Sequence, residues 1–278
     1  MPSAGKTTSG VRAASGVYGS VTPSERYRFF IKAAQPVGSG NALDISGNGA
    51  NAAIDAGTTD AAVWASAGFM TATGAAPGVG KGLTIPAAAS KSPLNWDFSK
   101  GQSLLLAMQV NFPALPAGSA WRQFSGDLTS VGGGISVLVG EASLAGGAGR
   151  LAVRVRDAAG NNNVYTPTAA APLLVAGQTH TVVAWIDGKS RSLSVYVDGT
   201  VSGFQSAQSL SAIVGSTVSN AGFNFGYYGD GAASSGTTGA KFANVHALVF
   251  DSVPANVDQL ILLISKHIAK AVEKRAVL

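Results

Sequence analysis

The clearest alternation of hydrophobic and polar side chains runs from residue 102 to residue 112. Leu104, Leu106, Met108 and Val110 fall on one face at a period of two, and the intervening side chains fall on the other. Pro113 ends the pattern, because proline cannot donate to a strand ladder. Shorter runs predict further strands at residues 28–32, 83–85, 135–139, 151–156, 179–186, 193–197, 223–228 and 242–250.

Polar turns that contain glycine separate these runs. The segment 187–191, Asp-Gly-Lys-Ser-Arg, is short enough to join the strands at 179–186 and 193–197 as a hairpin, and Asp198-Gly199 predicts a second tight turn. In strand 151–156 the alternation places Arg154 and Arg156 on the outward face. With no helical period between the strands, the chain is predicted to be all-β, an antiparallel sandwich of two sheets.

A helical period appears only near the C-terminus. Val257, Leu260, Ile261, Ile264 and Ile268 recur at helix spacing, and Asn256 precedes them as an N-cap. We expect the first half of this helix, 257–264, to pack on the sandwich. The basic second half contains Lys270, Lys274 and Arg275, which we expect to contact a partner.

Three parts of the chain are therefore expected. Residues 1–26 form an extended N-terminal arm rich in glycine, serine, threonine and alanine, which is either ordered against a partner or unstructured. Residues 27–265 form the sandwich, and residues 266–278 form a basic helical extension.

Composition narrows the class of protein. The chain has 278 residues, no cysteine and 36 glycines, about 13% against an average near 7%, without the period of collagen. Disulfides and thiolate chemistry are therefore excluded, and many tight turns are expected. The first ten residues lack the apolar segment of a secretory signal, and no apolar run approaches the length of a membrane span.

The net charge of +5 comes from the two ends of the chain. Residues 1–32 carry five basic side chains, among them Lys6 and Arg12, against one acidic side chain; residues 266–278 carry four against one. The body between them carries ten basic and twelve acidic side chains. A basic face for nucleic acid is therefore not expected on the sandwich.

Three blocks of sequence resemble laminin-G-like domains of the concanavalin A-like lectin/glucanase superfamily. The first is Asp44-Ile-Ser-Gly-Asn-Gly49. The second is Gly177-Gln-Thr-His-Thr-Val-Val-Ala-Trp-Ile-Asp-Gly188, followed by Leu193-Ser-Val-Tyr-Val-Asp-Gly199. The third is Phe223-Asn-Phe-Gly226 with the closing strand and helix. The resemblance covers residues 27–265 and implies a jelly-roll sandwich, a fold that hosts lectins, hydrolases, adhesins and virion parts.

Catalytic chemistry is not expected. Hydrolases with this fold commonly carry a Glu-x-Asp-x-Glu strand, because retaining cleavage needs two carboxylates about 5 Å apart. The only glutamates here are Glu25, Glu141 and Glu273, and that motif is missing. His180 lies at a structural strand position of the family, so we interpret it as a packed sheet histidine rather than a base.

Candidate binding residues lie at the end of the strand predicted at 223–228, in the turn that follows it, and at Trp64, outside the predicted strands. Tyr227, Tyr228 and Asp230, with Trp64, could stack on a sugar ring and hydrogen-bond its hydroxyls; burial as core plugs is the alternative, which also applies to Trp96 and Trp121. No cofactor is expected. Calcium is the one metal with candidate ligands, Asp44 and Asn48, although turn formation is the favoured explanation of those side chains.

Three features together favour a non-enzymatic bacteriophage structural protein: a fold used for adhesion, an N-terminus without an export signal, and basic extensions. It would belong to the tail, the fibres or the capsid decoration of the virion. Its expected partners are other virion proteins, further copies of itself and host glycans. A cellular carbohydrate-binding module or adhesin is the alternative, with a glycan hydrolase ranked below it.

Overall fold

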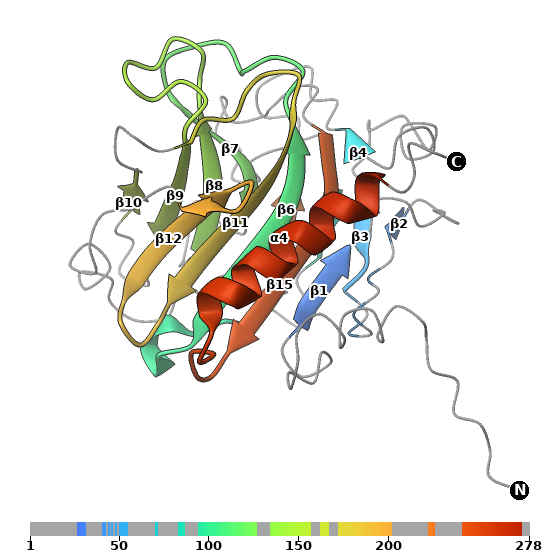
Figure 1. The fold of residues 1–278 in the computed structure, drawn as a ribbon, viewed down its shortest axis with the longest axis vertical. Helices are drawn as coiled ribbons and strands as arrows, with labels where there is room; N and C mark the ends of the chain where they lie inside the picture. The colour runs from blue at the N-terminus through green and yellow to red at the C-terminus, as the bar shows by residue number, and fades with distance from the viewer. Residues whose placement is uncertain are drawn as a thin grey trace, which may run out of the picture.

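The computed structural model forms a sandwich of two antiparallel sheets with one helix packed on its outside (Figure 1). It describes residues 27–31, 41–42, 44, 46, 48, 50–54, 70–71, 83–86, 94–126, 134–156, 162–166, 172–201, 222–225 and 241–273. The all-β, two-sheet prediction is confirmed, and every strand pair among the described residues is antiparallel.

Each sheet is assembled from strands that are distant in sequence. Sheet A has the order β1 (Tyr27–Ile31), β15 (Lys241–Phe250), β6 (Ser103–Asn111), β11 (Thr179–Asp187), β12 (Ser192–Val197) and β13 (Thr200–Val201), and β4 (Met70–Thr71) also pairs with β15. Sheet B has the order β10 (Asn162–Tyr165), β9 (Leu151–Arg156), β8 (Gly134–Gly140), β7 (Trp121–Gly126), β14 (Phe223–Phe225), β5 (Leu83–Ile85), β3 (Ala52–Ile54) and β2 (Asn41–Ala42).

The main core lies between the two sheets. The even-numbered apolar side chains of β6, from Leu104 to Val110, face it, as the alternation predicts. Phe124 of β7 bridges the sheets, because its ring lies 5.4 Å from that of Phe112 and 6.1 Å from that of Phe242. Aromatic contacts of this kind fix the distance between the layers.

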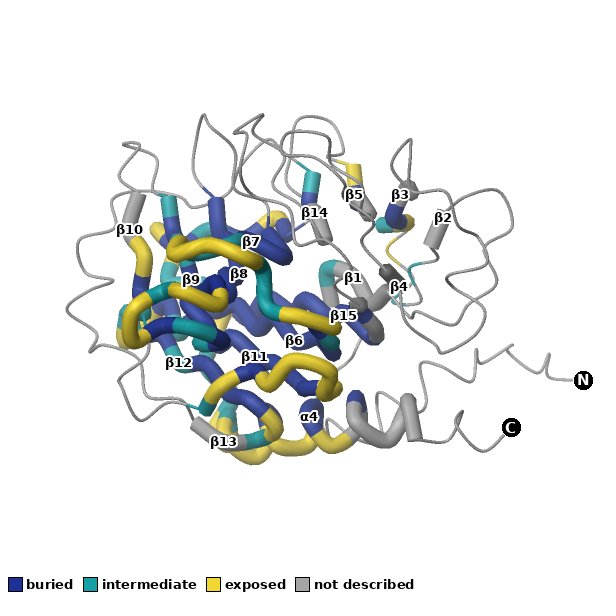
Figure 2. Tube along the Cα trace, turned by 90° about the horizontal axis from the view of Figure 1, so that it is seen from above, coloured by how far each residue is buried: buried dark blue, intermediate teal, exposed yellow. Residues whose placement is uncertain are grey.

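Helix α4 (Val257–Glu273) makes a third layer on the outer face of sheet A, as Figure 2 shows from above. The helix buries four apolar side chains against sheet A: Leu260, Ile261, Ile264 and Ile268. They pack on the odd-numbered side chains of β6 and β11 and on the even-numbered side chains at the end of β15. The predicted helix and its apolar stripe are confirmed. Burial continues through Ile268, so the packed part of the helix crosses the boundary expected at residue 265.

The sequence prediction missed β7, and this part of it was wrong: Trp121 begins a strand rather than lying outside one. The segment Trp121–Gly126 shows no alternation, because the register shifts between Gln123 and Ser125 and interrupts the period of two. The very short strands β2, β3, β4 and β13 and the polar strand β10 were also missed, because two to four residues carry too little pattern.

A similar irregularity in β15 explains a buried polar pair. The register shifts between Ala243 and His246, and Asn244 adopts φ 48°. Its amide donates to Gln109 Oε1 at 3.0 Å inside the layer under α4.

Within the described chain, no helix is both long and apolar enough to span a membrane. The predicted N-terminal arm, residues 1–26, lies outside the described residues.

Candidate functional site

The outer faces of the two sheets differ in chemistry. Sheet A is closed by α4 through leucine, isoleucine, tryptophan and phenylalanine side chains. The outward side chains of β7, β8 and β9 in sheet B are instead mixed, because polar and basic residues lie there among Leu138 and Ala152, which are both 0% exposed. We call Gln123, Ser136, Arg154 and Arg156 the sheet B patch.

Strand register places these four side chains together on one face. Ser136 of β8 lies opposite Arg154 of β9, and Gln123 of β7 lies opposite Leu138, two residues along β8 from Ser136. The intervening Ile135, Val137 and Val153 point into the core between the sheets. The patch therefore faces away from the core, and the outward position predicted for Arg154 and Arg156 agrees with this register.

Several polar atoms of the patch are buried without a hydrogen-bond partner. Gln123 is 1% exposed, and neither Nε2 nor Oε1 of its amide is paired. Ser136 is 0% exposed, with its Oγ unpaired, and the Nε of Arg154 is also buried and unpaired. Buried polar groups in folded proteins nearly always have partners, so this concentration calls for an explanation.

Gly126 packs closely on Ser136. It lies opposite Ser136 in the neighbouring strand, and a Cβ added at Gly126 would lie 2.5 Å from the Ser136 Cβ and 2.5 Å from the carbonyl oxygen of Ile135. Glycine is therefore required here by the close approach of β7 and β8.

The patch is half open at its β9–β10 edge. Arg154 and Arg156 are of intermediate exposure, and Val164, opposite Arg154 on β10, is 38% exposed. Strands β7 to β10 contain no aspartate or glutamate. The polar side chains of these strands are therefore either positively charged or neutral hydrogen-bonding groups.

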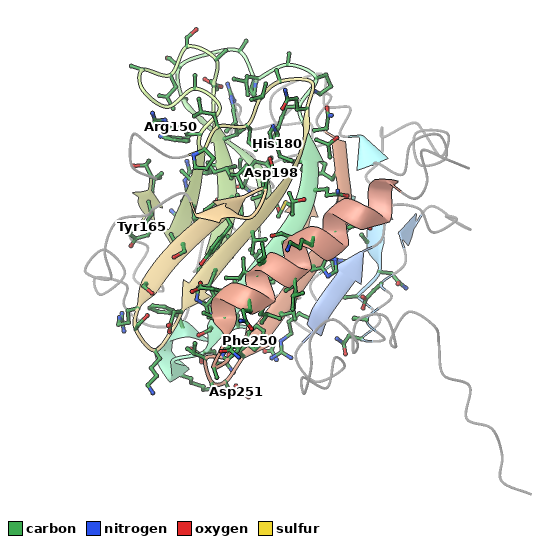
Figure 3. The ribbon with its side chains drawn as sticks, in the orientation of Figure 1. Arg150, Tyr165, His180, Asp198, Phe250 and Asp251 are labelled. Carbon is green, nitrogen blue, oxygen red and sulfur yellow. The ribbon has the colours of Figure 1, made fainter. Side chains whose placement is uncertain are left out.

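Beside the patch, the loops 112–120, 141–150 and 172–178 form what we call the loop end (Figure 3). Arg122 forms an ion pair there with Glu141, which is 1% exposed on its side chain and also accepts from the backbone N of Ala120 at 2.6 Å. Gly118 packs so closely on this carboxylate that a Cβ would collide with it. Glu141 is therefore a structural tie between loops.

His180 and Asp198 form the second polar pair of the loop end (Figure 3). The N–H of Val175 donates to His180 Nε2 at 2.9 Å, so Nδ1 carries the proton that it donates to Asp198 Oδ2 at 2.7 Å. The other carboxylate oxygen accepts from the N of Thr181. Both ring nitrogens are used within the fold, which agrees with the interpretation of His180 as a packed sheet histidine.

The remaining carboxylates with described contacts also serve local structure. Asp97 caps a short 3-10 helix (η2, Phe98–Lys100), and its hydrogen bonds with Ser99 lower the pKa of Asp97. Asp187 accepts from the backbone of the β11–β12 turn at Lys189 and Ser190. These are the turn and capping roles expected of aspartate.

The candidate calcium ligands Asp44 and Asn48 lie in a tight polar turn. The Asp44 carboxylate accepts from Ser46 N, Ser46 Oγ and Ala50 N at 2.7 to 3.1 Å. The Asn48 side chain donates to the carbonyl of Arg28 at 3.5 Å. Among the residues that the structure describes, no three acidic or histidine side chains gather as a metal site. The Asp44 contacts fit a turn, and the Asn48 contact ties this turn to β1.

The other predicted site residues are not placed. Tyr227, Tyr228, Asp230 and Trp64 lie outside the described residues, as do Lys6, Arg12, Lys274 and Arg275. Lys270 lies in α4, and only the backbone of this residue is described. Of the other aromatic candidates, Trp96 is a core plug, 1% exposed, whose Nε1 donates to the carbonyl of Gln102 at 2.8 Å.

Sequence reasoning did not find Gln123 or Ser136. Gln123 lies in the missed strand, and Ser136 is a small polar residue within a strand predicted only as apolar. The signal that was available is the outward column on β9, because two arginines at a period of two mark a polar outer face.

Comparison with known proteins finds solved structures with a similar fold, but no family model and no curated relative. No protein-family model matches the chain, and no curated protein matches its sequence. Among solved structures, the binding domain of botulinum neurotoxin serotype D matches with TM-score 0.57 and 8% identity, over 90% of this chain and 52% of that one. The shared feature is the β-sandwich fold.

Two further matches support the same fold. Trypanosoma rangeli sialidase in complex with 2,3-difluorosialic acid matches with TM-score 0.53 and 13% identity, over 86% of this chain and 33% of that one. The receptor binding domain of the botulinum neurotoxin C/D mosaic serotype matches with TM-score 0.51 and 7% identity, over 88% and 52%. This chain thus spans about half of the toxin domains and a third of the sialidase.

Proposed function

We propose that this chain is a non-enzymatic, lectin-like binding subunit that attaches to glycans. The observation that carries the proposal is the fold, an antiparallel β-sandwich that matches a toxin binding domain and a sialidase solved with 2,3-difluorosialic acid.

Two features support binding rather than hydrolysis. The buried carboxylate of Glu141 is committed to Arg122 and Ala120, and the described aspartates bind their own turns or neighbouring side chains. The fold matches include a toxin binding domain and a sialidase solved with a sugar ligand, which is consistent with carbohydrate recognition by related sandwiches.

We further propose that the subunit is part of a bacteriophage virion, on the tail, fibre or capsid, with its basic ends contacting neighbouring subunits or further copies of itself. The support comes from the sequence, because the extensions carry the excess positive charge and the body is close to neutral.

Two measurements test this function. The full chain, labelled and applied to an array of bacterial surface glycans and mammalian oligosaccharides, should bind a restricted subset without releasing free sugar. Mass spectrometry of purified virions that encode the chain should find it in stoichiometric amounts. Sugar release would contradict the non-enzymatic proposal, and absence from particles would favour a cellular adhesin.

A further inference from the structure

The segment 172–178 of the loop end is attached to the sandwich by three backbone N–H groups. Those of Leu174 and Gly177 donate to backbone carbonyls, each at 2.7 Å. The third lies between them, where the N–H of Val175 donates to Nε2 of His180 at 2.9 Å. A carbonyl oxygen does not titrate near neutral pH, but an imidazole does. The middle attachment is therefore the one that a change in pH can alter.

The hydrogen bonds of His180 require a neutral imidazole. A backbone N–H only donates, so Nε2 presents its lone pair to Val175, and Nδ1 carries the proton donated to Asp198 Oδ2 at 2.7 Å (Figure 3). A second proton can bind only at Nε2. It would place two N–H donors against each other, so the hydrogen bond to Val175 would be lost.

The opposite side of the ring would keep its partner after protonation. The Asp198 carboxylate is fixed beside the ring, because its other oxygen accepts from the N–H of Thr181 at 2.8 Å. A positively charged ring forms a stronger hydrogen bond with this carboxylate than a neutral ring does. His180 is 6% exposed and Val175 is 48% exposed, so water can reach the released N–H group. The segment should therefore move, and the histidine should stay.

We propose that the contact between His180 and Val175 is a pH-sensitive attachment, which acid opens by adding a proton to Nε2. The proposal stands independently of glycan binding. The attached segment carries Leu174, which is 3% exposed in the core, beside Leu173 and Val175, which are 46% and 48% exposed. Opening would loosen the packing of Leu174 and add apolar surface to the loop end at acidic pH.

The elements around His180 bring one ionised group into contact with its ring, the Asp198 carboxylate. Strands β6 and β13 and the segment 172–178 contain no titratable side chain. The described hydrogen bonds of the ring end on Val175 and Asp198. The neighbouring elements carry four further titratable or charged side chains: Asp187 of β11, Tyr196 of β12, and Glu141 and Arg150 of the loop 141–150.

Hydrogen exchange of the backbone amides of the full chain, at about pH 7.5 and about pH 5, tests the attachment. Histidine changes charge in this range, whereas model carboxyl side chains titrate near pH 4. After correction for the intrinsic effect of pH on exchange, the protection of the Val175 N–H should fall about 10-fold at the lower pH. The N–H of Ser143 is the internal control, because it is bonded to the carbonyl of Gly118 at 2.9 Å in the same loop end and should stay protected.

Two variants should each abolish the pH response, but in opposite states. His180→Gln supplies an amide oxygen that takes up no proton, so the Val175 N–H should be equally protected at both pH values. In Asp198→Asn the amide oxygen serves Thr181 and the NH₂ faces Nδ1, which shifts the ring proton to Nε2. The Val175 N–H should then exchange rapidly at both pH values. His267→Gln, in α4, is the matched control and should keep the parental response.

Three results would overturn the inference. The first is equal protection of the Val175 N–H in the parent at the two pH values. The second is a 10-fold fall in His180→Gln, because the acid effect would then arise from another group. The third is an equal fall at Ser143, which would show that acid loosens the whole loop end rather than one attachment.

Discussion

At the scale of single residues, Glu141 shows how one buried carboxylate orders the loop end. Its two oxygens receive the Arg122 guanidinium and the Ala120 N–H, and its side chain is 1% exposed. A glutamine there can accept from only one of these donors and turns its own NH₂ toward the other. The charge is therefore needed for both contacts.

We expect Glu141→Gln to lower the free energy of unfolding by about 2–4 kcal/mol, measured by urea denaturation, because breaking a buried pair leaves a charge without compensation. Lys100→Gln, which removes the exposed pair with Asp97 at 3.5 Å, should cost less than about 1 kcal/mol. Similar losses in the two variants would mean that the Glu141 pair does not form in solution.

At the scale of elements, the attachment of α4 rests on one face of the helix. Ile264 is 0% exposed in the layer against sheet A, and its neighbour Leu263 is 44% exposed. Ile264→Ala should cost about 2–4 kcal/mol in the free energy of unfolding, and Leu263→Ala less than about 0.5 kcal/mol. Comparable costs at the two positions in thermal and urea unfolding would contradict the observed face of α4.

A tyrosine links the same helix to sheet A. Tyr196 of β12 donates its hydroxyl to Asp258 of α4 at 3.2 Å, and burial together with the aspartate charge raises the pKa of Tyr196 from 10.0 to about 12. Because the folded state holds this proton more tightly than the unfolded chain does, its contribution to stability is complete below pH 10 and is lost as the pH rises toward 12.

Tyr196→Phe removes that titration. We expect the stability difference between parent and variant, by urea unfolding, to shrink or reverse between pH 10 and pH 12 by up to about 2 kcal/mol, since one pKa unit corresponds to about 1.4 kcal/mol. A difference that stays constant over this range would show that the Tyr196 hydroxyl is not in the buried, aspartate-facing environment.

The limits of sequence-based prediction follow the same elements. Strands with a clean period of two, such as β6 and β11, and the stripe of α4 were predicted to within a residue or two. β7 was missed because its shifted register breaks the period. The site was only partly predictable: Arg154 and Arg156 could be placed outward, but their proximity to Gln123 depends on strand pairing, which one sequence does not display.

At the scale of the whole molecule, the two sheets differ in what packs on their outer faces. Sheet A is covered by α4 and carries the second apolar layer, whereas sheet B contributes one apolar face to the core and carries a mixture of polar, basic and apolar side chains outward. The basic ends are a separate feature of the sequence, because residues 1–32 and 266–278 hold the excess of positive charge over a slightly acidic body. Glycan binding and attachment to neighbouring subunits should therefore be separable.

The separation can be measured with one variant of the full chain. Neutralising Lys6, Arg12, Lys274 and Arg275 to glutamine should reduce incorporation into virions several-fold, because attraction between charged surfaces steers and stabilises association. The same variant should keep its glycan affinity. Residual incorporation should fall less steeply with added salt than in the parent, since fewer charges remain to be screened. Particles that contain the neutralised chain at the parental level would show that the basic ends do not mediate attachment.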